Sequence, residues 1–90
     1  MNKFWFVYIV RCNDDSLYTG VTTDVVRRVD QHNSGRGAKY TRSRRPVRGV
    51  WEAMADSRST AQKIESSIKK LSKEEKEKLV VNGVGCMGLL

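Results

Sequence analysis

The sequence predicts an α+β domain, in which a small, mainly antiparallel three-stranded sheet is flanked by helices in the order β-β-α-β-α-α. Three features of the 90-residue chain support this fold class. Some segments are rich in aromatic and β-branched residues, turn residues join the first two of these, and capping residues precede segments whose apolar residues repeat at helical spacing. Strands and helices in this order are expected to form one sheet that the helices cover.

The first two strands are predicted at residues 4–12 and 17–21, joined by the most turn-like cluster of the chain. The first segment is apolar on both alternating faces, which is typical of a central strand covered on both sides. Because side chains alternate along a strand, Tyr8 and Tyr18 share a face only if an odd number of residues stays unpaired, for example a three-residue loop at residues 13–15. A two-residue loop would place the two rings on opposite faces.

A helix of about ten residues is predicted between the capping residues 22–24 and the helix stop Gly35. Its narrow apolar stripe consists of Val25, Val26 and Val29. Arg28 and His32 lie four residues apart, so they project from one face of this helix.

Residues 35–48 form the densest positive segment, with six cations, no acidic residue, two glycines and Pro46. We expect an exposed loop that binds backbone phosphates with little sequence information and with an affinity that falls steeply with salt. Tyr40 is expected to stack on an exposed base. The predicted nucleic-acid-binding residues are Arg36, Lys39, Tyr40, Arg42, Arg44 and Arg45.

The remaining elements are a third strand at residues 47–55 and two helices. The first of these helices is predicted to begin with a capping box at residues 59–62, and Glu65 lies directly beside its apolar stripe. That stripe consists of Ile64, Ile68 and Leu71. A second capping box at residues 72–75 is predicted to open a short charged helix that ends at about Val81.

The chain is predicted to form one domain over residues 1–81, followed by a loosely ordered tail over residues 82–90. A formal net charge of +7 and a pI near 9.8 make a polyanion the natural partner. Cys12 and Cys86 lie far apart without a zinc or disulfide pattern, which indicates a reducing interior. No apolar run approaches the roughly 18 residues of a membrane span, so we expect a soluble cytoplasmic protein with no membrane partner.

The two strand tyrosines, Arg28, His32 and Glu65 together resemble the pattern of the GIY-YIG nuclease superfamily and, within it, of a small single-domain, UPF0213-like subgroup. The first tripeptide of the family falls on residues 6–8 (FVY) and the second on residues 18–20 (YTG), so both tyrosines and the last glycine are kept, while Phe6 replaces the first glycine. The resemblance covers about residues 4–81. Residues 33–46 look especially similar to the single-domain subgroup.

The resemblance implies a site that cleaves phosphodiesters, with Tyr8, Tyr18, Arg28, His32 and Glu65 as its catalytic residues. Arg28 is a planar, permanently charged group suited to stabilising the transition state. Tyr8 is expected to act as the general base or to orient the water, with His32 accepting or relaying its proton. Tyr18 would complete the ring of hydrogen bonds.

The resemblance also implies one metal ion, Mg²⁺ or Mn²⁺, with Glu65 as its protein ligand. A single carboxylate is a sufficient protein ligand for Mg²⁺, because this ion keeps several waters and takes further oxygens from its substrate. Such an ion would polarise the scissile phosphate and stabilise the leaving oxygen.

The sequence therefore predicts a metal-dependent endonuclease, or a structure-specific nuclease, that hydrolyses phosphodiester bonds in DNA, with RNA as the less favoured substrate. A second interpretation is a nucleic-acid-binding module with little or no nuclease activity, since Phe6 replaces a family glycine and no DNA-targeting domain is expected. A partner protein could then supply substrate targeting. A third interpretation is an interaction protein whose basic face binds an acidic partner.

Each candidate residue also has a purely structural interpretation. Tyrosines in strands usually serve packing. Arg28 could pair with Asp24, and His32 suits the C-terminal end of a helix. Glu65 has Lys69 four residues later, which is the spacing of an ordinary helical ion pair.

Overall fold

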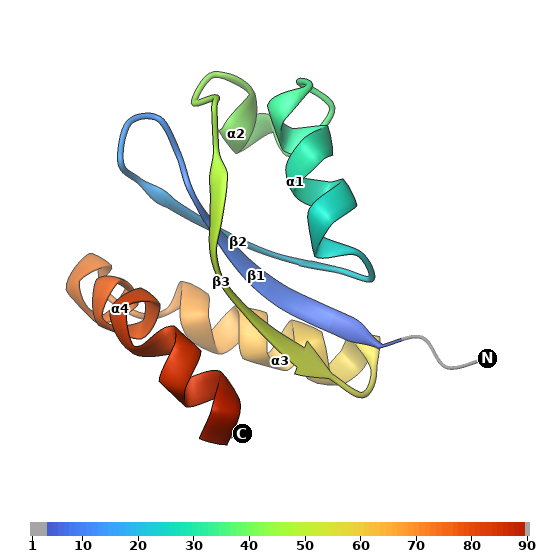
Figure 1. Ribbon diagram of the computed structural model, residues 1–90, viewed down its shortest axis with the longest axis vertical. Helices are drawn as coiled ribbons and strands as arrows, with labels where there is room; N and C mark the ends of the chain where they lie inside the picture. The colour runs from blue at the N-terminus through green and yellow to red at the C-terminus, as the bar shows by residue number, and fades with distance from the viewer. Residues whose placement is uncertain (1–3, 90) are drawn as a thin grey trace.

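A computed structural model describes residues 4–89, with side chains described through residue 82. The sheet has the order β2-β1-β3, with antiparallel pairing throughout, and Figure 1 shows α1 and α2 on one side of it and α3 and α4 on the other. The elements are β1 (Trp5–Arg11), β2 (Leu17–Thr22), α1 (Val25–Asn33), α2 (Lys39–Arg42), β3 (Arg48–Ala55), α3 (Arg58–Lys69) and α4 (Lys73–Leu89). The predicted α+β fold is confirmed, with the one-turn helix α2 added to the predicted order.

The hairpin of β1 and β2 has the three-residue loop that the two tyrosines require. Cys12 N–H donates to the Ser16 carbonyl at 2.8 Å, which closes the loop, and Asp15 takes a positive φ of 71° within it. Aspartate tolerates this left-handed conformation better than most residues, and three-residue hairpins commonly need it. Tyr8 therefore pairs with Gly20, which lies two residues from Tyr18 along β2. The two tyrosines share a face, which is the outcome predicted for a three-residue loop.

The two faces of the sheet bury two separate cores. One face carries Val7 and Ile9 of β1 and packs against α3 and α4 in a hydrophobic cluster. The other face carries Tyr8 and Val10 and packs against α1. This division follows from side-chain alternation along β1, the central strand. It places Tyr8 on the same side of the sheet as α1 and α2.

The helix starts show one wrong prediction and one confirmed prediction. The α3 helix begins at Arg58, because Ser57 has extended backbone and its hydroxyl accepts from Thr60 N–H at 3.1 Å. The predicted capping box at residues 59–62 is therefore wrong, since Ser59 already lies inside the helix. The box at residues 72–75 is confirmed.

The last helix is longer than predicted. The backbone of α4 is helical to Leu89, beyond the expected end at about Val81. The prediction of loose order over residues 82–90 remains a prediction, because the side chains of residues 83–90 lie outside the described part of the chain. Across residues 4–89, no helix combines the length and apolar character needed to cross a bilayer.

Candidate active site

The centre of the site is a buried contact between a tyrosine of β1 and a histidine of α1. Tyr8 is 1% exposed and His32 is 0% exposed. The Tyr8 hydroxyl lies 2.8 Å from His32 Nε2, which is hydrogen-bond distance. Two of the five predicted catalytic residues, 24 positions apart in sequence, are thus in direct contact.

A third buried polar residue extends this contact. His32 Nδ1 lies 2.7 Å from the Thr41 hydroxyl, and that hydroxyl donates to the Ala38 carbonyl at 2.9 Å. Thr41 is fully buried and belongs to α2. The prediction of an exposed loop over residues 35–48 is therefore wrong for this residue, because its side chain faces inward to satisfy the imidazole.

Two glycines make room for the Tyr8 and His32 rings. A Cβ on Gly20 of β2 would lie 2.6 Å from the Tyr8 hydroxyl, so no larger residue fits there without displacing the ring. A Cβ on Gly37 would lie 2.7 Å from His32 Cα and would also collide with the imidazole ring. Gly20 is the glycine kept in the second tripeptide, whereas Gly37 was not singled out from the sequence.

Tyr18 contacts the same histidine and connects it to the surface. Its ring meets the His32 ring edge-on with centroids 5.5 Å apart, and it stacks on Tyr40 at 5.7 Å. The guanidinium carbon of Arg44 lies 3.9 Å from the centroid of the Tyr40 ring. Tyr40 therefore already has two stacking partners, so base stacking by Tyr40 remains a prediction that needs one of them to move.

Arg28 lies on the same helix as His32 and is half-buried. Its guanidinium donates to Gln31 Oε1 at 3.0 Å, not to Asp24, which instead caps the helix through Arg27 N–H. The positive charge of Arg28 acts on both buried rings, because it opposes the burial that raises the pKa of Tyr8 and adds to the burial that lowers the pKa of His32. The structure thus places this cation beside the buried pair.

Glu65 reaches the site less directly, since α3 packs on the opposite face of the sheet and contacts β1 and the edge strand β2. Its side chain is 21% exposed, and Oε2 pairs with Lys69 Nζ at 3.2 Å, as the helical spacing allowed. Its negative charge nevertheless acts on Tyr8, because it contributes to the raised pKa of that phenol. Glu65 is close enough for electrostatic coupling, but its direct contact is Lys69.

The pKa shifts of the two buried rings favour one protonation state. Burial raises the pKa of the Tyr8 phenol above its usual value near 10, and this outweighs the opposing effect of Arg28. Burial also lowers the pKa of His32 below its usual 6.5, and Arg28 adds to that shift. At neutral pH the phenol is therefore protonated and the imidazole is neutral, so a proton donor faces a proton acceptor.

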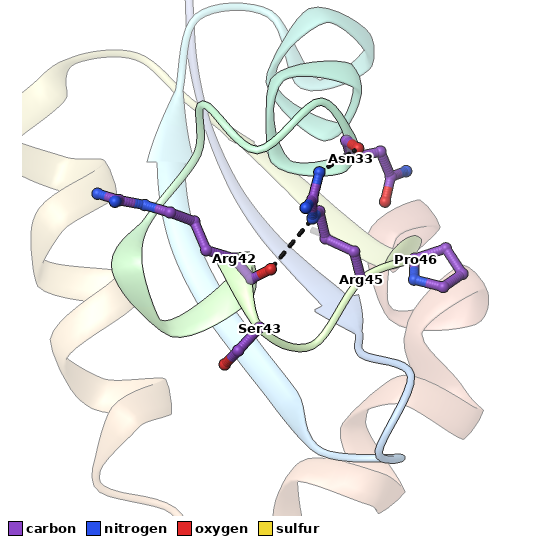
Figure 2. Close-up of a pocket in the computed structure, with 5 residues that line it drawn as sticks. All are labelled: Asn33, Arg42, Ser43, Arg45 and Pro46. Atoms are coloured by element: carbon purple, nitrogen blue, oxygen red, sulfur yellow. Dashed lines mark hydrogen bonds between the residues drawn. The ribbon is translucent and has the colours of Figure 1, made fainter.

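Some cations of the basic segment, residues 35–48, are held by intramolecular partners and others are not. Arg44 pairs with Asp14 at 2.9 Å, and Arg45 donates to the carbonyls of Arg42 and Asn33, at 3.0 and 3.3 Å. Figure 2 shows Arg45 turned back toward Asn33 while Arg42 extends outward from a hollow of about 390 Å³. Within residues 4–82, the exposed side chains of Lys39, Arg42 and Arg48 make no hydrogen bond. These three cations are available to an anionic ligand.

Comparison with known proteins matches this chain to one family model and to several UPF0213 proteins. A family model described as the GIY-YIG catalytic domain matches residues 4–78. The chain is 53% identical over 83 residues to a UPF0213 protein of Haloquadratum walsbyi, covering 92% of this chain and 93% of that protein. It is 49% identical over 78 residues to a UPF0213 protein of Staphylococcus saprophyticus, covering 87% and 95%.

Two solved structures are similar in sequence and in fold. The solution NMR structure of a UPF0213 protein from Bacillus halodurans matches with a TM-score of 0.58 and 48% identity, over 89% of this chain and 86% of that one. The solution NMR structure of a protein from E. faecalis matches with a TM-score of 0.60 and 40% identity, over 91% and 90%.

Proposed function

The chain belongs to the GIY-YIG family, which is of nuclease type, and from that premise we propose that it is a metal-dependent endonuclease that hydrolyses phosphodiester bonds in DNA. One observation carries the proposal. Tyr8 and His32, which the sequence predicted as catalytic, form a buried hydrogen bond of 2.8 Å on the face that also holds Tyr18 and is next to Arg28.

The reaction needs an attacking water that loses its proton. A phenol with a raised pKa is a poor base if it must first ionise in isolation. The contact with His32 removes this difficulty, because Tyr8 Oη can take the proton of the water while its own proton passes to His32 Nε2. The neutral imidazole is ready to receive that proton at neutral pH.

The remaining residues act on the phosphate. Arg28 carries a planar guanidinium that can contact two phosphate oxygens and balance the charge that accumulates on them in the transition state. Tyr18 is half-buried beside His32, so it fixes the imidazole ring and can direct its hydroxyl toward the water or the phosphate. Lys39 and Arg42 supply surface contacts to the nucleic-acid backbone.

Glu65 fits the role of protein ligand to one divalent ion. Its carboxylate is partly exposed and its charge already acts on the Tyr8 phenol. Within the described residues no group of three acidic, cysteine or histidine side chains could hold a metal ion, so Glu65 would be the single protein ligand and Mg²⁺ would keep several waters. When bound, the ion supplies positive charge at the scissile phosphate and the leaving oxygen. Lys69 must release the carboxylate for an ion to bind.

A second candidate function is a nucleic-acid-binding module with little turnover. The pairing of Glu65 with Lys69 and the presence of Phe6 in place of a family glycine favour it. In that case a partner protein would direct the module to its substrate.

One assay separates the two candidates. The purified chain is mixed with branched, flapped and single-stranded DNA, and with single-stranded RNA, in the presence of Mg²⁺ or Mn²⁺. Arg28→Ala and Glu65→Ala serve as inactive variants, and Arg27→Ala, at an exposed position of the same helix, serves as the matched control. The nuclease proposal expects cutting that needs the ion and is lost in both variants but not in the control. Binding without metal-dependent cutting on every substrate would support the module instead.

A further inference from the structure

Thr41 is the buried polar residue to which the sequence assigned no role. We infer that Thr41 is a positioning residue, which holds the proton of neutral His32 on Nδ1 and so leaves Nε2 free to accept the proton of Tyr8. The tautomer assignment stands on geometry alone, whereas its effect on catalysis rests on the proposed nuclease function.

The hydrogen-bond pattern around the threonine hydroxyl fixes the direction of each bond. A hydroxyl group has one proton to donate. The Thr41 hydroxyl donates it to the Ala38 carbonyl at 2.9 Å, since a carbonyl can only accept. We assign that proton to the carbonyl, so the hydroxyl oxygen accepts at the 2.7 Å contact with His32, which puts the imidazole proton on Nδ1. Nε2 then carries only a lone pair, and the Tyr8 hydroxyl donates to it at 2.8 Å.

Burial restricts these side chains to the hydrogen-bond partners that the protein itself supplies. His32 and Thr41 are both fully buried, so water is not available to replace a lost partner. A buried donor or acceptor without a partner is costly. In the other tautomer the Thr41 hydroxyl would have to turn to Nδ1, which leaves the Ala38 carbonyl only the 3.1 Å bond from Thr41 N–H, and the buried Tyr8 proton would lose its acceptor. The proton on Nδ1 is the arrangement that satisfies all three groups.

The chain after α1 is folded to deliver this hydroxyl. Gly35 takes a φ of +85°, which lets the backbone turn back over the end of α1. Gly37 then passes so close to His32 that a Cβ would collide with the ring. The one-turn helix α2 follows and places Thr41 against Nδ1. The basic segment thus contributes the wall of the buried site as well as exposed cations.

The proton transfer balances in this arrangement. The Tyr8 O–H bond breaks as a new N–H bond forms at His32 Nε2, and the Tyr8 oxygen takes the proton of the attacking water, so Tyr8 is a neutral phenol again. The resulting imidazolium keeps its proton on Nδ1, hydrogen-bonded to the Thr41 oxygen. Tyr8 from β1, Tyr18 from β2 and Arg28 from α1 are the ionisable groups that face or influence His32. Without the Thr41 oxygen the proton would be free to move to Nε2, and His32 would donate to Tyr8 instead of accepting from it. An imidazole in the wrong tautomer cannot act as that base.

Nitrogen NMR of the full chain tests the tautomer directly. His32 is the single histidine of the sequence, so ¹⁵N-histidine labelling gives one pair of ring signals that need no assignment. At neutral pH, without added metal or DNA, the spectrum is expected to show the proton on Nδ1. A proton on Nε2 would overturn the inference whether or not the protein cleaves DNA.

Two variants extend the test to catalysis. Thr41→Val keeps the shape of the side chain but removes the oxygen, so we expect the ring signals to shift toward the Nε2–H tautomer and kcat to fall about 10- to 100-fold with KM changed less than about twofold. Thr41→Ser restores the hydroxyl and is expected to restore both the wild-type tautomer and kcat.

The tautomer inference and the nuclease proposal can be rejected independently of each other. A wild-type tautomer in Thr41→Val, or Thr41→Ser behaving like Thr41→Val, would contradict the inference. If Thr41→Val fails to fold, the wild-type spectrum and Thr41→Ser decide it. Absence of cleavage by the wild-type protein would reject the proposed function and leave the tautomer result valid.

Discussion

The two faces of β1 differ in kind although one seven-residue strand supplies both. Val7 and Ile9 enter a cluster with Trp51, Ala61 and Ile68 that contains no charged group. On the opposite face, β1 places the Tyr8 phenol at hydrogen-bond distance from a buried imidazole. The first arrangement gains free energy simply by removing apolar surface from water.

The second face gains less from burial, because each polar group must find a partner inside the protein. Tyr8, His32 and Thr41 satisfy one another in a single line of hydrogen bonds. Such a network fixes the position of every group in it. Under the proposed function, the face toward α3 and α4 mainly stabilises the fold, with Glu65 of α3 as the exception, whereas the face toward α1 and α2 holds the groups of the proposed proton transfer.

Apart from the change at Tyr8 itself, the largest expected effect is on catalysis and concerns the arginine beside the polar face. Arg28→Lys keeps the positive charge but loses the planar pair of donors, so cleavage is expected to fall about 10²- to 10³-fold at saturating DNA. Arg27→Lys, at the exposed neighbouring position, is the control and should cleave like wild type. Equal cleavage rates for the two variants would contradict the proposal that Arg28 acts in cleavage beside Tyr8 and His32.

The next effect is on stability and concerns the apolar face. Ile68 is 6% exposed, so Ile68→Ala is expected to lower the free energy of unfolding by about 2–5 kcal/mol in urea titrations. Val81→Ala, at a position that is 79% exposed, should change it by less than about 0.5 kcal/mol. The folded fraction of Ile68→Ala should cleave at the wild-type rate. A slower folded enzyme would show that the apolar core of this face, and not only Glu65, takes part in catalysis.

A smaller effect is expected at Gly20, whose lack of a side chain leaves room for the Tyr8 ring. In Gly20→Ala the added Cβ would displace the Tyr8 hydroxyl from His32, so cleavage should fall about 10- to 100-fold. Gly49→Ala is the matched control on β3, because its Cβ would meet only Val29 at an ordinary 3.8 Å. Single-turnover rates compare the two. Unchanged cleavage in Gly20→Ala would mean that the contact between Tyr8 and His32 is not needed.

The smallest effect concerns the ion pair at the rim of the apolar face. Hydrogen bonding to Arg11 lowers the pKa of Glu77 from its usual 4.5 to about 2. A depressed carboxyl pKa stabilises the fold above the unfolded pKa and loses that contribution as the pH falls to about 2. Wild type should therefore melt at a higher Tm than Glu77→Gln at pH 6, and this difference should vanish near pH 2. A constant difference would refute the pairing, and cleavage should not change.

The parts of the site that follow from local periodicity could be predicted from the sequence. The alternation of strand side chains restricted Tyr8 and Tyr18 to one face or to opposite faces according to the loop length, and the structure selects the three-residue loop that puts them on one face. Helical spacing likewise put Arg28 and His32 together. Both patterns are rigid, because their periods are set by backbone geometry.

Other parts depend on contacts that no local pattern encodes. Thr41 is buried only because the chain after Gly35 folds back onto His32, and a threonine within a basic run gives no sign of this. Arg44 is held by Asp14, which lies 30 residues earlier. The start of α3 was misplaced because two nearby serines competed as caps and the backbone of Ser57 decided between them.

The most direct test compares two adjacent residues on opposite faces of β1. Tyr8→Phe removes only the hydroxyl, so single-turnover cleavage of DNA with Mg²⁺ is expected to fall about 10²- to 10⁴-fold. Ile9→Val removes one buried methylene, so the free energy of unfolding should fall by about 0.5–1.5 kcal/mol. Cleavage by the folded protein should stay at the wild-type rate. Equal cleavage by the two variants would contradict the claim that the face bearing Tyr8 and His32 is where the chemistry takes place.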